Sequence, residues 1–287
     1  MGDALIVENL NKSYNDFKLK DISFTMPKGC IMGLIGENGA GKTTTIKGIL
    51  NIIKRDSGSV RVFGKDNIYY EKEVKEDIGV VFDECCFYEA LNSKNISTIM
   101  KKIYKNWEES TFNFYLNKFN IPEKKIIKEY SKGMKMKLSI AIALSHKAKL
   151  LILDEATSGL DPIVREEILD IFLEFIQNEE HSVLLSTHIT TDLEKIADYI
   201  TFINKGEIVF SKSKDELTYS MAIAKCGKDE FELIDKNYMV AYRKSQFGYE
   251  ILINNSNDFI RKYENIIIDK ATIEDIMLFY IRGEKLC

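Results

Sequence analysis

The chain has 287 residues, of which 45% are hydrophobic and 29% charged, a composition typical of a globular protein with one large core. Its formal net charge of −4 argues against a general nucleic-acid binder. The longest apolar stretch, 138–153, is interrupted by His146, Lys147 and Lys149, so we expect no membrane span there. If the protein acts at a membrane, we expect it to act through a partner protein.

Strand and helix patterns alternate through the first two thirds of the chain. Strands are predicted at 4–7, 17–26, 30–35, 59–63, 78–82, 150–153 and 183–185. Helices are predicted at 42–51, within 91–119, at 131–145 and after Pro162. The continuous apolar run before Gly36 suits a strand buried on both faces. This alternation predicts an α/β fold, with a mostly parallel sheet and helices on both of its faces.

The pattern changes after Ser213. Residues 231–253 read as two or three strands, and 259–263 and 272–282 read as helices, with Thr272 as a candidate helix cap. We therefore expect residues 213–287 to form a small C-terminal α+β appendage, which we call the accessory segment.

Residues 36–43 match the phosphate-loop pattern G-x-x-x-x-G-K-[ST] in full, between a predicted strand and a predicted helix. Glycines let backbone N–H groups curl around an anion, and the helix start adds its positive dipole. Lys42 would reach the β- and γ-phosphates, Thr43 would offer its hydroxyl to Mg²⁺, and Thr44 would reach the α-phosphate. The predicted nucleotide-binding residues here are Gly36, Asn38, Gly39, Ala40, Gly41, Lys42, Thr43 and Thr44.

A second group of candidates follows two predicted strands. Asp154 and Glu155 end the apolar run 150–153, where Asp154 would hold Mg²⁺ through its water shell. Glu155, one residue further on, would polarise the attacking water. His188 follows the strand 183–185 and could orient that water, although spacing alone leaves a purely structural histidine open.

From about Ala4 to about Leu217, these residues resemble the ATP-binding-cassette (ABC) ATPases, which bind ATP and Mg²⁺. Tyr14 resembles the family's aromatic that stacks on adenine. The segment 130–134, Tyr-Ser-Lys-Gly-Met, resembles the family signature, usually Leu-Ser-Gly-Gly-Gln. The segment 158–161, Ser-Gly-Leu-Asp, resembles the loop that joins two subunits. His188 takes the switch-histidine position.

The resemblance implies an ATPase that works as a pair. Ser131 and the backbone of Gly133, at a helix N-terminus, would address ATP bound to a second ATPase subunit, identical or paralogous, with Asp161 at the junction. It also implies an antiparallel β subdomain and a helical subdomain at about 84–146, both within an ATPase domain 1–212, beside the accessory segment 213–287. The remaining partner would be a membrane-spanning permease, with this chain peripheral at the cytoplasmic face of a bacterial plasma membrane.

Three positions depart from the family pattern. Lys132 replaces the first signature glycine and Met134 replaces the glutamine. Asp83 falls where the family usually has a glutamine that touches Mg²⁺ and the attacking water. We expect Asp83 to accept a hydrogen bond or meet Mg²⁺ there, although Glu84 or a water could fill that role.

These residues are compatible with three functions. The favoured one is the ATPase of a bacterial exporter of the bacitracin-resistance or phenol-soluble-modulin kind, with amphipathic or antimicrobial peptides as cargo. The second is an ABC ATPase acting on ribosomes or DNA, against which the single cassette and the acidity argue. The third is a nucleotide-binding module with little hydrolysis, which Asp83 and the altered signature suggest.

Overall fold

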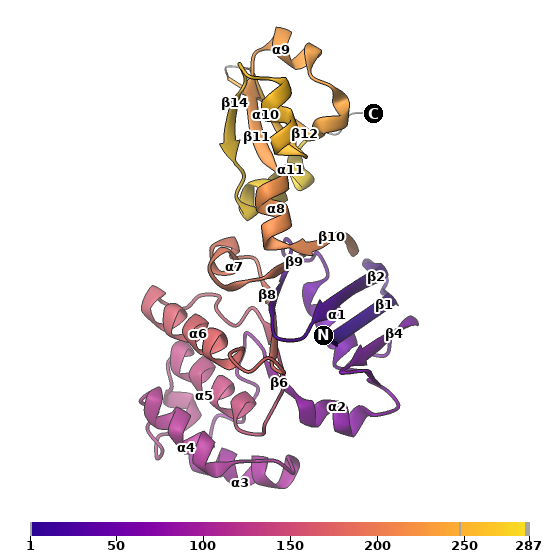
Figure 1. The fold of residues 1–287 in the computed structure, drawn as a ribbon. Helices are drawn as coiled ribbons and strands as arrows, with labels where there is room; N and C mark the ends of the chain where they lie inside the picture. The colour runs from indigo at the N-terminus through magenta and orange to yellow at the C-terminus, as the bar shows by residue number, and fades with distance from the viewer. Residues whose placement is uncertain (1, 247, 285–287) are drawn as a thin grey trace.

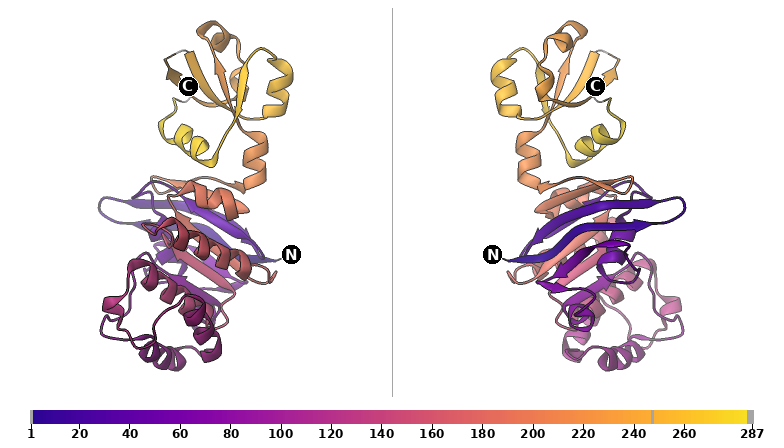
Figure 2. Two further views of the ribbon diagram at one scale, coloured as in Figure 1. Left: turned by 90° about the vertical axis from the view of Figure 1, so that its left-hand side faces the viewer. Right: turned by 90° about the vertical axis from the view of Figure 1, so that its right-hand side faces the viewer.

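The computed structural model describes residues 2–246 and 248–284, so the end of the predicted accessory segment, 285–287, lies outside the described residues. No helix in these ranges has the length and apolar character needed to cross a bilayer. The described residues form three sheets. Figures 1 and 2 show an elongated molecule with a group of helices at one end and the accessory segment at the other.

The first sheet is antiparallel and has the order β2-β1-β4-β5. Its strands are β1 (Asp3–Ser13), β2 (Lys18–Pro27), β4 (Ser57–Val62) and β5 (Lys65–Asp66). In β2, buried residues alternate with exposed ones, because one face of the sheet packs on the core while the other meets solvent. This sheet corresponds to the expected antiparallel β subdomain.

The second sheet is the centre of the molecule and has the order β10-β9-β3-β8-β7-β6. Its strands are β3 (Ile31–Ile35), β6 (Ile78–Val81), β7 (Leu150–Asp154), β8 (Ser182–Thr187), β9 (Tyr199–Asn204) and β10 (Glu207–Ser213). All pairings are parallel except that of β9 with β10. Every residue of β3, β7 and β8 is buried, as expected for strands covered on both faces. The mostly parallel sheet predicted from the sequence is confirmed.

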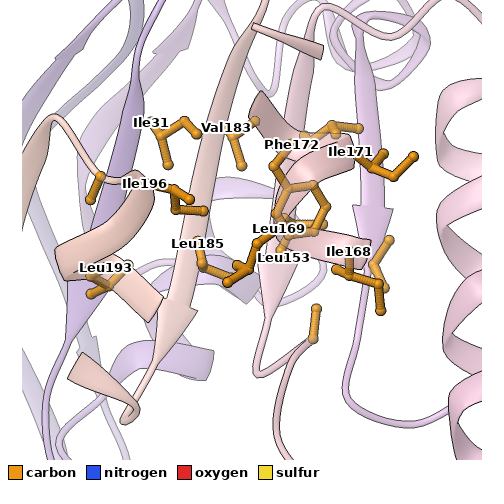
Figure 3. Close-up of a cluster of buried hydrophobic side chains, with 14 of the residues drawn as sticks. Ile31, Leu153, Ile168, Leu169, Ile171, Phe172, Val183, Leu185, Leu193 and Ile196 are labelled. Carbon is orange, nitrogen blue, oxygen red and sulfur yellow. The ribbon is translucent and has the colours of Figure 1, made fainter. Parts of the chain in front are cut away.

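Helices cover both faces of this sheet. Figure 3 shows one face, where α6 (Pro162–Phe175) contributes Ile168, Leu169, Ile171 and Phe172, and α7 (Thr190–Ile196) contributes Leu193 and Ile196. On the opposite face lie α1 (Lys42–Ile49) and the first sheet, whose apolar residues form a second core cluster with β3 and β8. The short helix α2 (Glu71–Asp77) leads into β6.

Three helices gather at the lower end of the molecule in Figure 1: α3 (Ser93–Ile103), α4 (Glu109–Lys118) and α5 (Lys132–Leu144). They fall within the expected helical subdomain. Helix α5 lies close against β6, because Gly79 carries no side chain. A Cβ there would come within 2.7 Å of the Ala143 carbonyl oxygen. This close approach fixes α5 next to the strand that leads to Asp83.

The accessory segment is the α+β unit at the top of Figure 1. Its antiparallel sheet has the order β12-β13-β11-β14. Its elements are α8 (Lys214–Ser220), β11 (Ala222–Cys226), α9 (Lys228–Leu233), β12 (Met239–Ser245), β13 (Gly248–Ile253), α10 (Ser256–Lys262), β14 (Ile267–Lys270) and α11 (Ile273–Arg282). We propose 212/213 as the boundary between the ATPase domain and the accessory segment. Buried residues on both sides of this boundary belong to one core cluster.

One expectation within this segment is wrong. Phe231 was expected in a strand, but it lies in helix α9. The Glu230 carboxylate accepts from the backbone N–H of Gly227 at 2.8 Å, which stabilises a helix start there. Phe231 then stacks on Tyr249 with ring centroids 4.0 Å apart, so the aromatic residue packs on the sheet without belonging to it.

Candidate functional site

The predicted site residues come together at the carboxyl edge of the central sheet. The phosphate loop follows β3, His188 follows β8, Asp154 ends β7, and Asp83 comes shortly after β6. These four strands are neighbours in the order β3-β8-β7-β6 and run parallel. In open α/β sheets, ligands bind outside the carboxyl ends of the strands, so this edge is where chemistry is expected.

The phosphate loop wraps around the ammonium group of Lys42, whose side chain is only 6% exposed. Lys42 Nζ donates to the carbonyl oxygen of Gly36 at 2.8 Å. Gly41, just before α1, has a φ of +116°, and a Cβ there would lie 2.7 Å from a methyl carbon of Leu19. Glycine is therefore required on both conformational and steric grounds. Of the predicted phosphate-binding residues, Asn38, Gly39 and Thr43 are exposed, which leaves them open to a ligand.

Glu155 lies between two of the other candidates. Its Oε1 is 3.2 Å from Lys42 Nζ, and its Oε2 is 2.7 Å from His188 Nδ1. The backbone of Glu155 has a φ of +53°, a conformation that is uncommon outside glycine, and its N–H donates to the Ser186 carbonyl at 2.9 Å. The turn thus presents this carboxylate, 16% exposed, to the phosphate loop.

Asp154 is 5% exposed and its Oδ1 has no hydrogen-bond partner. Burial raises the pKa of this carboxyl, the nearby hydroxyls of Thr43 and Ser186 counter the shift, and the charges of Glu155 and Asp83 add to it. A buried carboxylate oxygen without a partner, close to a threonine hydroxyl, fits a hydrated divalent cation that is also held by phosphates. Among the described residues, no three His, Cys, Asp or Glu side chains cluster as metal ligands, so such a cation would depend on the nucleotide and on water.

A cavity of about 460 Å³ opens over the phosphate loop. Its lining includes residues from the loop, from α1, and from the ends of β6 and β7: Phe17, Glu37, Asn38, Gly39, Gly41, Lys42, Thr43, Thr44, Asp83 and Glu155. Asp83 therefore does lie at the candidate site. Gly36 and Ala40 are the buried residues of the loop that do not line this cavity, and the Ala40 carbonyl accepts from the Gly206 N–H at 2.9 Å.

The aromatic residue on the cavity wall is Phe17, which the sequence did not single out. Tyr14 is 49% exposed and is not among the lining residues. The two belong to one turn, in which the Tyr14 N–H donates to the Phe17 carbonyl at 2.8 Å. The only signal that could have found Phe17 was its position three residues after Tyr14 in a short turn between two strands.

The signature segment lies at the start of α5. Ser131 caps this helix, its hydroxyl accepting from the Met134 N–H at 3.2 Å, and it is exposed. Neither Ser131 nor Gly133 lines the cavity over the phosphate loop. Lys132 instead lines a separate cavity of about 500 Å³, which also contains Asp83, Glu84 and Lys135. The signature and the phosphate loop of the same chain thus face different cavities that share Asp83.

The loop 158–161 lies beside the signature. Asp161 caps α6, accepting from the Val164 N–H at 3.0 Å. A Cβ at Gly133 would lie 3.4 Å from Val164, and one at Gly159 would lie 2.8 Å from Lys132 Nζ. The starts of α5 and α6 are therefore adjacent, and Ser131 and Asp161 are both exposed there.

Comparison with known proteins agrees with this geometry. A family model described as "ABC transporter" matches residues 19–158. Over 218 residues, the chain is 36% identical to the lantibiotic transport ATP-binding protein SrtF of Streptococcus pyogenes, covering 74% of this chain and 91% of that one. Over 270 residues it is 30% identical to the bacitracin transport ATP-binding protein BcrA of Bacillus licheniformis, covering 93% and 87%.

Solved structures show the same similarity. The ATP-binding subunit of an ABC transporter matches with a TM-score of 0.68 and 26% identity, over 74% of this chain and 90% of that one. The phosphate loop, the Asp154–Glu155 turn and the signature at the start of α5 all lie within the residues that the family model matches. The chain belongs to the ABC transporter family, as an ATP-binding subunit whose ATPase activity is coupled to transport.

Proposed function

We propose that the carboxyl edge of the central sheet forms one half of an ATP hydrolysis site in which Glu155 polarises the attacking water. The observation that carries this proposal is the position of Glu155 between Lys42 and His188, at 3.2 and 2.7 Å. With Nδ1 protonated, His188 donates to Glu155 and holds its carboxylate in one orientation. When ATP enters, its γ-phosphate competes with Glu155 for Lys42, which frees Glu155 Oε1 to accept from water.

We also propose which residues bind ATP and Mg²⁺ at this edge of the sheet. Backbone N–H groups of the loop from Gly36 to Gly41 and the start of α1 would hold the phosphates, with Lys42 on the β- and γ-phosphates and Thr44 on the α-phosphate. Thr43, Asp154 and Asp83 would hold Mg²⁺, directly or through water, and the bound ion supplies charge neutralisation of the phosphates. Tyr14 would stack on the adenine, at the entrance to the cavity that Phe17 lines.

Substitution of Glu155 by glutamine tests this assignment. In Glu155→Gln the side chain would keep its size and its contact with His188 but could not act as a base, so we expect turnover to fall by roughly 100-fold or more. ATP affinity should persist, measured with a fluorescent ATP analogue. Phosphate release at the wild-type rate would show that Glu155 is not the base.

We further propose that the site is completed by a second ATPase subunit, either a second copy of this chain or a paralogue. Ser131 and Gly133 start a helix of 13 residues whose N-terminus is exposed and lies outside its own phosphate cavity. A helix N-terminus favours an anion, so these residues would address ATP held by the partner. Asp161, exposed beside them, would lie at the junction of the two subunits.

A membrane permease is the partner that the family implies, and one surface hollow suits its docking. A hollow of about 650 Å³ lies away from the phosphate loop, between the end of α1, α2, β6 and the end of α3. Its wall includes Ile52 and Ile103, which are 55% and 59% exposed, and Phe82, which precedes Asp83. Exposed apolar surface of this kind marks an interaction site. Binding here would place the chain at the cytoplasmic face of a bacterial plasma membrane, with Asp83 next to the permease.

Export of amphipathic or antimicrobial peptides is the transport we propose. Its support is that two similar proteins carry names that refer to lantibiotic and bacitracin transport. The chain reconstituted with its permease in vesicles should hydrolyse ATP faster when such a peptide is present. Equal stimulation by peptides and by unrelated solutes would remove the cargo from the proposal without affecting the ATPase.

A further inference from the structure

Helix α7 links the switch histidine to the rest of the molecule. It starts at Thr190, two residues after His188, and runs to Ile196. Its inner side chains, Leu193 and Ile196, pack on the central sheet in Figure 3. The approach to β3 is so close that a Cβ at Gly33 would lie 2.5 Å from Leu193. Any displacement of α7 along the sheet would therefore change the position of His188.

The first turn of α7 is anchored to the ATPase core. Asp192 is 2% exposed, and its Oδ1 lies 3.3 Å from Arg165 Nε in α6. Helix α6 starts at the loop 158–161, so this ion pair ties α7 to the segment that follows Glu155. An ion pair that is largely removed from water holds its geometry more firmly than one at the surface, because breaking it would leave a buried charge.

The last turn of α7 is anchored to the accessory segment. Glu194 Oε1 accepts from the backbone N–H of Ile273, the first residue of α11, at 3.0 Å. The Glu194 carbonyl accepts from Lys214 Nζ, in α8, at 3.1 Å. A carboxylate that accepts from the first backbone N–H of a helix is favoured by charge as well as by hydrogen bonding. Glu194 thus connects α7 with two helices of the accessory segment.

Apolar packing supports the same connection. Ile273, Ile276 and Phe279 of α11 are buried in the core cluster that also contains Leu193 and Ile196 of α7. The ring of Tyr280 packs on Phe210 of β10 at 5.4 Å between centroids, and on Phe202 of β9 at 6.2 Å. Helix α11 is therefore packed against the ATPase domain as part of its core, and the views of Figures 1 and 2 show it at the junction.

We propose that Glu194 is a positioning residue for ATP hydrolysis: through its bond to the start of α11, the accessory segment fixes α7 and hence His188. This inference rests on the role proposed above for His188. It assigns the accessory segment a part in setting the geometry of the switch, in addition to any contact it makes with a partner. Glu194 itself does not touch the phosphate cavity.

Glu194 can be tested because its side chain is exposed, so its truncation leaves no hole in the core. We expect Glu194→Ala to lower kcat by about fivefold while KM for ATP stays within about twofold of wild type. Glu194→Gln keeps an acceptor oxygen for the Ile273 N–H and should restore most of the rate. Glu274→Ala, at an exposed acid in the first turn of α11, is the matched control and should leave kcat unchanged.

A double-mutant cycle separates positioning from general structural support. If Glu194 acts through His188, then Glu194→Ala should have no further effect on single-turnover hydrolysis in a His188→Ala background. The same fivefold loss in both backgrounds would overturn the inference, and so would a wild-type kcat for Glu194→Ala. Unchanged turnover in His188→Ala would overturn the proposed role of His188 and this inference with it. If His188→Ala does lower turnover, additive effects of the two substitutions would overturn this inference alone.

Discussion

At the scale of residues, the site is a balance of charges around Lys42. Lys42 is held by the Gly36 carbonyl and by Glu155, and Asp154 and Asp83 lie close by. These groups together place more negative than positive charge at the sheet edge. Bound Mg²⁺ would compensate the acids, and the phosphates would take over Lys42. This charge arrangement supports the proposal that the site binds a nucleotide together with Mg²⁺.

Asp154 makes the pH dependence of stability predictable. Burial raises its pKa above the ordinary 3.8, so the folded protein takes up its proton more readily than the unfolded chain. Ionised Asp154 therefore lowers the free energy of unfolding. This loss is absent below pH 3.8, the pKa in the unfolded chain, and it grows as the pH rises through the higher pKa of the folded state. At pH 7 Asp154→Asn should stabilise the nucleotide-free protein, by about 1–2 kcal/mol in urea unfolding.

The companion measurement for Asp154→Asn is urea unfolding with Mg-ATP present. Mg-ATP should stabilise the wild type but not the variant, because the variant lacks the carboxylate that would bind Mg²⁺. A variant that is less stable than wild type at pH 7 would show that Asp154 makes contacts that outweigh its burial. A variant that still gains stability from Mg-ATP would remove Asp154 from the cation site.

Tyr14 shares a turn with Phe17, which lines the cavity over the phosphate loop. Tyr14→Ala should weaken ATP binding by about 1–3 kcal/mol, the worth of one stacked base, while saturated turnover changes little. Titration with a fluorescent ATP analogue measures this, with Tyr219→Ala, at a tyrosine 74% exposed in α8, as the control. Unchanged affinity in Tyr14→Ala together with weakened affinity in Phe17→Ala would transfer the stacking role to Phe17.

The candidate site was predictable from the sequence where it is local. The phosphate loop and the Asp154–Glu155 turn are short segments whose residue types at fixed spacing imply phosphate and cation binding. The pairing of Glu155 with both Lys42 and His188 was not predictable, because it depends on the order β3-β8-β7 in the sheet. Phe17 was missed for a similar reason: only the fold shows that its ring reaches Gly41.

At the scale of elements, the fit between β6 and α5 fixes the signature helix. Gly79→Ala would force a Cβ to within 2.7 Å of the Ala143 carbonyl oxygen and of Leu151. Overpacking of this kind costs about 1–3 kcal/mol, which should appear as a lower urea midpoint. Gly2→Ala is the matched control, because the nearest atom to its Cβ would be 3.9 Å away and Gly2 caps no helix. Equal stability of Gly79→Ala and wild type would mean that α5 is free to move from β6.

Elements with long apolar runs or clear helical periods were predictable, and short mixed ones were not. The fully buried β3 and β7 stand out as continuous apolar segments. Strand β11, Ala-Ile-Ala-Lys-Cys, is short and contains two alanines, so its place at the centre of the accessory sheet follows from its pairing with β13 and β14. Helix α9 depends on the Gly227–Glu230 cap, which overrides the strand preference of Phe231.

At the scale of the whole molecule, three parts contribute to the proposed ATP hydrolysis site at the carboxyl edge of the central sheet. The helical group carries the signature, the central sheet carries the phosphate loop and Glu155, and the accessory segment holds the helix that follows His188. The central sheet and the accessory segment share one core cluster, so a displacement of one would shift the other. Closure of two subunits around ATP would bring the signature of one to the phosphate loop of its partner.

We propose that ATP joins two subunits through a site that neither completes alone. This pairing is tested most directly by sedimentation velocity of the Glu155→Gln variant with and without Mg-ATP. We predict a monomer without nucleotide or with ADP, a dimer with Mg-ATP, and a return to monomer when Ser131→Arg is added. A variant that binds Mg-ATP and remains a monomer at every concentration, or a dimer that survives Ser131→Arg, would contradict the account.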